Sequence, residues 1–374
     1  MQPFFTTLDR LPSVIALPLA DYLQEDSDSQ PVLKLWHSCD VIEMTLRLLV
    51  MVGIADLRRH GPLPASLLND LRARIEEPTL GKWRGMAGAV AEEITRTSSA
   101  VPELPGFVQQ ALVPLLDGPR EAYPSSDPGA RRTVRTAENS FSQLRNRLAH
   151  GGGMTRVVGA RLLKMWEGPF REAMSNADWL MDLDLVIRDA SGVFGILRGP
   201  VPRAALYTPR PDIDLSDSLR EENEVVVIRD RHILRIWPLG LYGLPRSLDS
   251  ESVQPEQPAP QAYVRRGEVS LHFTPVGSAE VCQSIGNSRS MDEFRKLFQL
   301  DAVADVGVNL FVVPGFERDL QKDAAQLVGR AAQLDTLRRL LAENPQGVSR
   351  RGTNCSRSWP GRRAVLQRSR LSGL

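Results

Sequence analysis

The chain has 374 residues, of which 42% are hydrophobic and 24% charged, and its formal net charge is +1. This composition allows two or three domains with hydrophobic cores and excludes a wholly disordered protein. The longest nearly apolar stretch, residues 46–57, is about half the length of a membrane span, and the N-terminus lacks the basic start and the cleavage site of a signal peptide, so we expect a cytoplasmic protein.

The first half of the chain is predicted to be helical. Pro31 begins a long segment with apolar residues at spacings of three and four, the period of a buried helix face: Leu35, Cys39, Ile42, Leu46 and Leu49. Shorter amphipathic segments follow at 64–75, 83–94 and 107–116. Together with the two segments described next, they predict an all-helical domain over residues 1–182.

Two further helices are expected before the pattern changes. Residues 133–150 form one of them, which should end at the glycines 151–153, because glycine readily takes the left-handed conformation that terminates helices. Residues 155–181 form the other, and Gly168-Pro169 should kink or break it.

After Met181 the sequence turns to short alternating runs that are typical of strands. The predicted strands are 183–187, 193–197, 224–229, 232–237 and 269–274. We expect a small antiparallel β domain over 183–300, with a mobile proline-rich loop at 246–261 and a closing helix at 291–300. The predicted fold class is therefore α+β.

The remaining segment changes composition abruptly. Residues 301–326 are interpreted as a linker, and 327–348 have helical periodicity. Residues 349–374 contain seven arginines and no acidic residue, without helical or alternating periodicity, so we expect a disordered Arg-rich tail.

The most informative motif lies near the end of the predicted helix 133–150. Residues 144–151 read Leu-Arg-Asn-Arg-Leu-Ala-His-Gly. Asn146 and His150 are four residues apart and share a helix face, and the long side chain of Arg145 flanks that face. An imidazole beside a permanent cation suffices for metal-independent RNA cleavage, because the imidazole moves a proton and the guanidinium stabilises the charge on phosphate.

This Arg-Asn-x-x-x-His motif in a helical domain resembles the signature of the HEPN superfamily (higher eukaryotes and prokaryotes nucleotide-binding). Many members of that superfamily are dimeric ribonucleases with a shared cleft. The resemblance implies that Arg145, Asn146 and His150 are the catalytic residues of a homodimer that acts on RNA without a metal or another cofactor.

Two alternatives remain open for the same residues. In a structural interpretation, His150 caps the C-terminus of a helix and Arg145 and Arg147 are solvated. In a non-catalytic interpretation, the protein is a sensor or adaptor whose helical domain mediates oligomerisation and whose β domain binds a ligand or partner.

A second resemblance concerns residues 327–337, which read Leu-Val-Gly-Arg-Ala-Ala-Gln-Leu-Asp-Thr-Leu. This segment is similar to the helix that precedes the nucleotide-binding core of AAA+ and STAND-type ATPases, including bacterial defence proteins. The chain contains no Gly-x-x-x-x-Gly-Lys-Ser/Thr phosphate loop, so we expect no ATPase activity from it. The resemblance implies the truncated start of an ATPase module, and hence an endoribonuclease effector of a bacterial conflict or signalling system.

The Arg-rich tail has two interpretations. It reads like an out-of-frame translation of GC-rich DNA, which would make the chain the N-terminal remnant of a larger protein. It is otherwise a natural flexible basic tail that contacts RNA through its arginines.

The remaining chemistry-bearing residues predict no metal site. Cys39, Cys282 and Cys355 are far apart and form neither a disulfide framework nor a zinc ribbon. His37 and Cys39 are two residues apart and cannot form a helical metal pair, and Cys39 is expected in the core.

Two histidines of the β region and one acidic run are also expected to have no catalytic role. His232 and His272 fall on separate strands, and His272 alternates with apolar neighbours, so it should face solvent. The acidic side chains between residues 212 and 222 predict a solvated loop.

Overall fold

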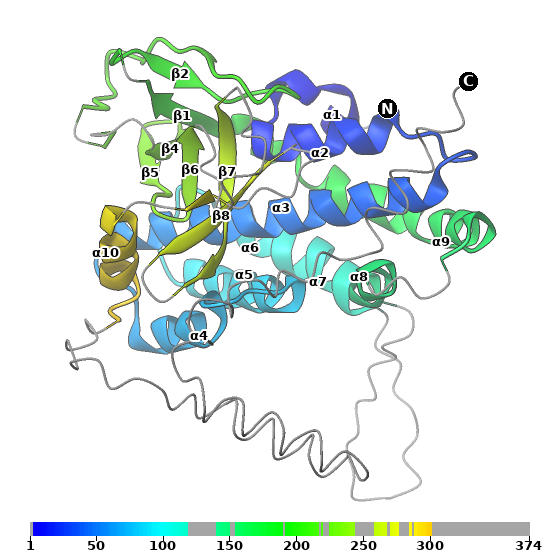
Figure 1. The fold of residues 1–374 in the computed structure, drawn as a ribbon. Coiled ribbons are helices and arrows are strands. Elements are labelled where there is room, and N and C mark those ends of the chain that lie inside the picture. Colours follow the sequence, from blue (N-terminus) through cyan, green and yellow to red (C-terminus); the bar gives the residue numbers. More distant parts are fainter. Residues whose placement is uncertain are drawn as a thin grey trace, which may run out of the picture. The chain divides into compact units, whose positions relative to one another are not determined.

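The computed structural model describes residues 3–118, 140–149, 154–189, 191–216, 218–219, 224–243, 258–267, 270–276, 284–285 and 288–300. They belong to one unit, Met1–Leu300, that combines helices with two antiparallel sheets, which confirms the α+β class (Figure 1). The predicted linker 301–326, the helical segment 327–348 and the tail 349–374 lie outside the described residues.

The helical part is arranged around α3 (Pro31–Arg58), which begins at the predicted proline and is buried along most of its length. It packs against three helices, α2 (Ser13–Gln24), α5 (Leu80–Ile94) and α9 (Arg156–Ser175). The other described helical elements are α1 (Pro3–Thr6), η1 (Leu8–Arg10), α4 (Ala65–Ile75), α6 (Leu104–Gly106), the π-helical η2 (Phe107–Leu112), α7 (Val113–Asp117), α8 (Phe141–Ala149) and η4 (Asp178–Asp182). Within the described residues, no helix is long and apolar enough to cross a membrane.

The helices α8 and α9 differ from their predicted extents. The described part of the predicted helix 133–150 is α8, which runs from Phe141 to Ala149, whereas 119–139 and 150–153 lie outside the described residues. Of the kink or break predicted at Gly168-Pro169, the break does not occur, and α9 continues to Ser175. Packing outweighs the missing proline N–H, because apolar side chains on both sides of Pro169 are buried on one helix face: Leu162, Leu163, Trp166, Phe170, Ala173 and Met174.

The strands form two antiparallel sheets. The first has the order β3-β2-β1-β4-β5, with β1 (Asp184–Arg188), β2 (Phe194–Ile196), β3 (Ala205–Leu206), β4 (Val225–Arg229) and β5 (His232–Arg235). The second has the order β6-β7-β8-β9, with β6 (Gly240–Gly243), β7 (Ala259–Arg266), β8 (Leu271–Pro275) and β9 (Ser284–Ile285). All five predicted strands are present, and β3, β6, β7 and β9 are additional.

The prediction of a loop over 246–261 is wrong for its last residues, which belong to strand β7. It begins at Ala259 and pairs with β6 on one side and β8 on the other. Ala259, Gln261 and Ala262 are buried there, so tertiary pairing overrides a local composition that is poor in strand-forming residues. Residues 246–257 lie outside the described residues.

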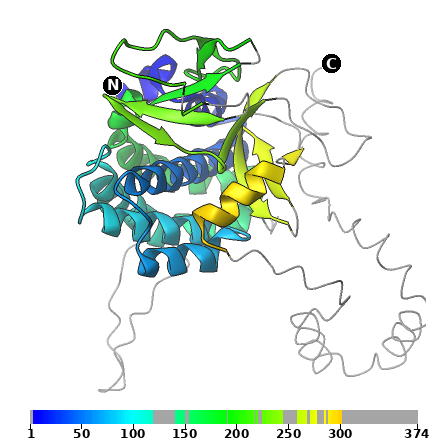
Figure 2. The same ribbon diagram turned by 90° about the vertical axis from the view of Figure 1, so that its left-hand side faces the viewer.

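Helices and sheets share one hydrophobic core. Leu48 and Met51 of α3 meet Leu185 of β1 and Val225 of β4 around a void of only about 10 Å³. The helix α10 (Ser288–Leu297), close to the predicted closing helix, buries Phe294 beside the second sheet (Figure 2). The predicted boundary at residue 183 therefore separates two kinds of secondary structure and not two cores.

The outer face of the first sheet has a small core of its own. Val186, Val226 and Ile228 are covered there by apolar side chains of the segment that follows β3, namely Ile213, Leu215 and Leu219. This covering segment forms one wall of a recess described below.

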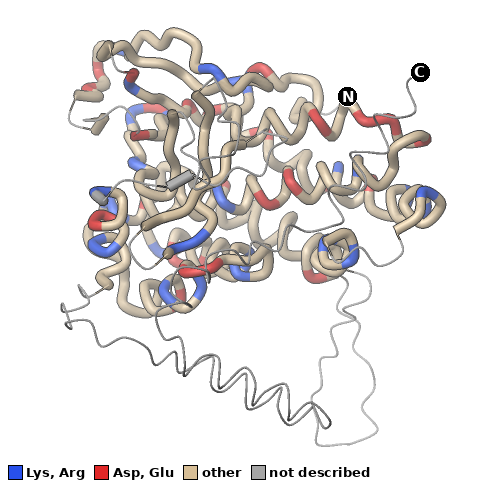
Figure 3. Tube along the Cα trace, viewed as in Figure 1, with Lys and Arg blue, Asp and Glu red and all other residues tan. Residues whose placement is uncertain are grey.

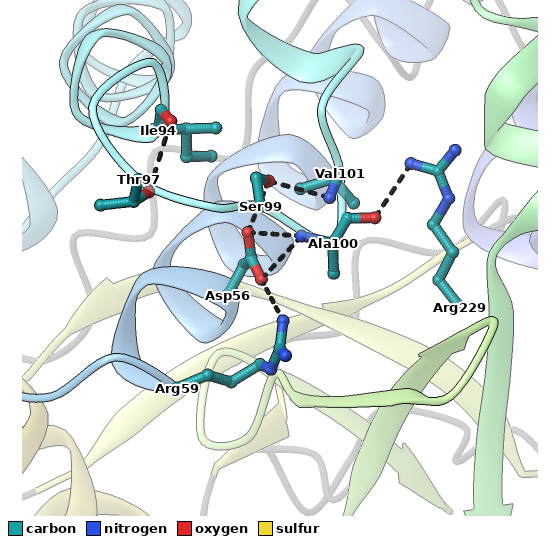
Figure 4. Close-up of polar contacts among 8 residues, drawn as sticks. All are labelled: Asp56, Arg59, Ile94, Thr97, Ser99, Ala100, Val101 and Arg229. Carbon is teal, nitrogen blue, oxygen red and sulfur yellow. Dashed lines mark hydrogen bonds and ion pairs between the residues drawn. The ribbon is translucent and has the colours of Figure 1, made fainter.

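A buried polar joint links α3 to the sheet (Figure 4). Asp56 is fully buried and accepts hydrogen bonds from the Ser99 hydroxyl (2.6 Å) and the Ala100 N–H (3.2 Å), and it pairs with Arg59 at 2.8 Å. The Ala100 carbonyl accepts from Arg229 of β4 at 3.2 Å. The loop before α6 is thereby held between α3 and β4.

Candidate functional site

The helix α8 presents part of the predicted catalytic motif at the surface. Phe141, Leu144 and Leu148 are buried on its inner side. Arg145 lies at the margin with 33% of its side chain exposed, and Asn146 is exposed. His150, the third predicted catalytic residue, lies outside the described residues, one position beyond Ala149.

The guanidinium of Arg145 is held from α3. Its Nη2 lies 3.7 Å from Oε2 of Glu43, and the other carboxylate oxygen of Glu43 accepts a hydrogen bond from Arg47. Arg47 also donates to the Tyr263 carbonyl of β7 at 3.3 Å. Glu43 thus orients a cation that is one-third exposed, and this pair could not be predicted because Glu43 and Arg145 lie on helices far apart in the chain.

The thiol beneath this contact is inert. Cys39 is 2% exposed, and burial, together with the charges of Asp40 and Glu43, raises the pKa of its thiol against the opposing effect of Arg145. A protonated, buried thiol is neither a nucleophile nor a metal ligand, so the expected core role of Cys39 is confirmed. In the part of the chain that the structure describes, no group of His, Cys, Asp and Glu side chains could hold a metal ion.

A histidine and three acids form a second polar cluster, where α2 ends and α3 begins. His37 has Nε2 3.8 Å from Glu25 and Nδ1 3.9 Å from Asp40. Burial lowers the pKa of His37, and the charge of Asp21 opposes this shift. Burial raises the pKa values of Asp21 and Glu25. Sequence reasoning missed this cluster, although the i, i+3 spacing of His37 and Asp40 could have indicated half of it.

One histidine of the β region, His272, has a different environment from the one expected. His272 is 9% exposed, so the prediction that it faces solvent is wrong. It lies on β8, between β7 and β9, and its Nε2 is 3.5 Å from the Ser270 hydroxyl. Leu271, His272 and Phe273 are all buried, so both faces of β8 are covered, and simple alternation does not reveal this.

A surface recess of about 350 Å³ lies where η1, the end of η4 and the first sheet meet. Its lining combines apolar and charged side chains: Arg10, Met181, Asp182, Asp184, Arg198, Tyr207, Thr208, Arg210, Ile228 and Asp230. Arg198 forms an ion pair with Asp184 and donates to the Met181 carbonyl at 3.2 Å. The sequence did not predict this recess, because its residues come from several separate segments.

Basic and acidic positions are interspersed along the described chain (Figure 3). Contact of this part of the chain with RNA would therefore depend on particular arginines.

Comparison with models of protein families, with curated proteins and with solved structures gives no match to this chain. Functional inference consequently rests on the side chains described above.

Proposed function

We propose that the protein is a metal-independent endoribonuclease whose catalytic residues are Arg145, Asn146 and His150. The observation that supports this most directly is the guanidinium of Arg145, which is one-third exposed on α8 and oriented by Glu43. A cation fixed in position can stabilise charge as it develops on a phosphate, without first having to be ordered.

In the proposed reaction, His150 removes the proton from a ribose 2′-hydroxyl, which attacks the adjacent phosphorus and displaces the 5′-oxygen of the next nucleotide. Arg145 neutralises the additional negative charge of the phosphorane. Asn146 orients the His150 imidazole by a side-chain hydrogen bond. A second proton-handling group must protonate the leaving oxygen, and we assign it to His150 of a second copy.

The surface of α9 supports a homodimer. Val158 is 42% and Met165 47% exposed, and their spacing of seven residues places both on one face of the helix that follows the motif. Exposed apolar side chains that share a face can form a contact surface. Burying them in a two-fold interface would bring two motifs into one cleft.

The resemblance of residues 327–337 to the start of an ATPase module supports a regulatory context. We propose that the nuclease is the effector part of a STAND-type protein of bacterial conflict or signalling.

The test is cleavage of labelled single-stranded RNA by the full chain in EDTA. His150→Ala should lower the rate by about 10²-fold or more, and Arg145→Gln by a similar factor, because proton transfer and charge stabilisation each contribute about that much. Asn146→Ala should slow cleavage without lowering the melting temperature. Arg96→Gln, which alters an arginine exposed on another surface, is the matched control and should cleave normally.

Loss of all cleavage on adding EDTA, or full activity of His150→Ala, would contradict the proposal. Light scattering at micromolar concentration should show a dimer, and an active monomer would exclude the two-copy cleft.

The recess beside the first sheet favours a second candidate, the non-catalytic sensor or adaptor. The sensor or adaptor function predicts a stable protein that oligomerises and binds a ligand but leaves RNA intact in the same assay.

A further inference from the structure

The recess between η1, η4 and the first sheet has the features of a small-ligand site. Met181 is 5% and Ile228 2% exposed, so they provide an apolar base. Charged side chains of both signs surround this base. The volume of about 350 Å³ is at the lower end of the range for ligand pockets.

The recess is lined by three arginines and three aspartates, and one residue of each sign is paired with the other. Asp184 is already paired with Arg198. Arg10 and Arg210 are both exposed, and neither forms an ion pair within the described residues. These two guanidiniums can hold the anionic part of a ligand, because each can donate two parallel hydrogen bonds to a carboxylate or phosphate.

The acids of the recess limit which anions fit. Asp182 and Asp230 are exposed, and both lie close enough to Arg229 to raise its pKa, an effect added to that of its hydrogen bonds with Glu103. As carboxylates they accept hydrogen bonds only. A bare anion would be repelled by them, whereas a molecule with hydroxyl or amino groups could satisfy them.

Tyr207 adds a neutral polar group. Burial, and then the charge of Asp184, raise the pKa of its hydroxyl, against the effects of Arg210 and Arg198. The hydroxyl therefore keeps its proton at neutral pH and can donate to an anionic oxygen.

We propose that this recess binds a small organic anion that carries its own hydroxyl or amino donors. Arg10 and Arg210 hold the carboxylate or phosphate, and Asp182 and Asp230 accept hydrogen bonds from the donors. The proposal is independent of the ribonuclease activity, because none of these side chains belongs to the Arg145 site.

Calorimetric titration of the full chain at low salt tests the proposal with four probes. Glucose 6-phosphate and gluconate combine an anionic group with hydroxyl donors, inorganic phosphate has the anion without the carbon-bound hydroxyls, and glucose has the hydroxyls without the anion. Saturable binding of glucose 6-phosphate or gluconate at millimolar concentration is expected, and the stronger of the two identifies phosphate or carboxylate as the anion.

The variants Arg10→Gln and Arg210→Gln should each weaken this binding at least about fivefold, since each removes charge-assisted hydrogen bonds. Both residues are exposed, so neither variant should alter the melting temperature. Arg203→Gln changes an exposed arginine that does not line the recess and should leave binding unchanged.

Three results would overturn the proposal. They are the absence of saturable binding for both two-part probes, equal affinity for inorganic phosphate or glucose, and unchanged affinity when Arg10 and Arg210 are replaced together.

Discussion

At the scale of single residues, Asp56 is the carboxylate in the α3 region, within the described residues, for which burial costs the most free energy. Its side chain is fully buried, and Ser99, Ala100 and Arg59 supply the hydrogen bonds that replace water. A buried charge is tolerated only when such partners are complete.

Asp56→Ala should therefore lower the free energy of unfolding by about 3 kcal/mol or more, because it leaves the Ala100 N–H and the Ser99 hydroxyl without their acceptor. Denaturant unfolding followed by circular dichroism measures this loss. Asp70→Ala is the matched control: Asp70 forms an exposed pair with Arg74, and its loss should cost less than about 1 kcal/mol. Equal effects of the two substitutions would show that the polar joint does not stabilise the fold.

The environment of His37 predicts that the stability of the fold depends on pH. Its pKa is lower in the folded chain than in the unfolded chain because of burial, with the charge of Asp21 opposing, and its two ring nitrogens face Glu25 and Asp40. Below about 6.5, the ordinary pKa of histidine, the unfolded chain binds the proton first, so this residue's contribution to stability falls as the pH falls through that range.

The raised pKa values of Asp21 and Glu25 have the opposite effect on stability. These two carboxyl groups stabilise the fold at low pH, and that stabilisation is lost as the pH rises through their pKa values in the folded state. His37→Gln should remove the decline in melting temperature between pH 7.5 and 6. It should leave the changes in melting temperature at lower pH as they are in the unaltered protein. Melting curves over this range compare the two proteins, and parallel curves would mean that His37 does not contribute.

At the scale of elements, two glycines of α9 provide a comparison within one helix. A Cβ at Gly159 would lie 2.4 Å from Cγ2 of Val32 and 3.2 Å from its backbone nitrogen, so α9 and the start of α3 are in close contact there. A Cβ at Gly168 would meet nothing within 4 Å.

Gly159→Ala should destabilise the protein by about 1–3 kcal/mol, since overpacking outweighs the better helix propensity of alanine. Gly168→Ala should be neutral or stabilise it by up to about 1 kcal/mol. Thermal melts of the two variants measure the contrast. A stabilising Gly159→Ala would mean that α9 and α3 separate easily.

The elements also show which features of the fold can be predicted from the sequence. Apolar spacing predicted the start of α3 and the five strands with branched residues, because one periodic face determines such segments locally. Strand β7 was missed because it begins inside the proline-rich segment, whose composition is poor in strand-forming residues, although its partners β6 and β8 are its neighbours in the chain. Arg145 could be selected from its motif, but its partner Glu43 could not, because the two residues lie on helices far apart in the chain.

At the scale of the whole described unit, the continuous core has a consequence for synthesis on the ribosome. Leu48 and Met51 of α3 are covered partly by Leu185, Val225 and Ala262, which are translated much later. At about 5–20 residues per second, the helices would wait roughly 10 to 40 seconds until the last of these residues, Ala262, is made. During that interval the apolar face of α3 in the nascent chain is exposed to water. We therefore expect chaperones that recognise exposed hydrophobic segments to bind the nascent chain.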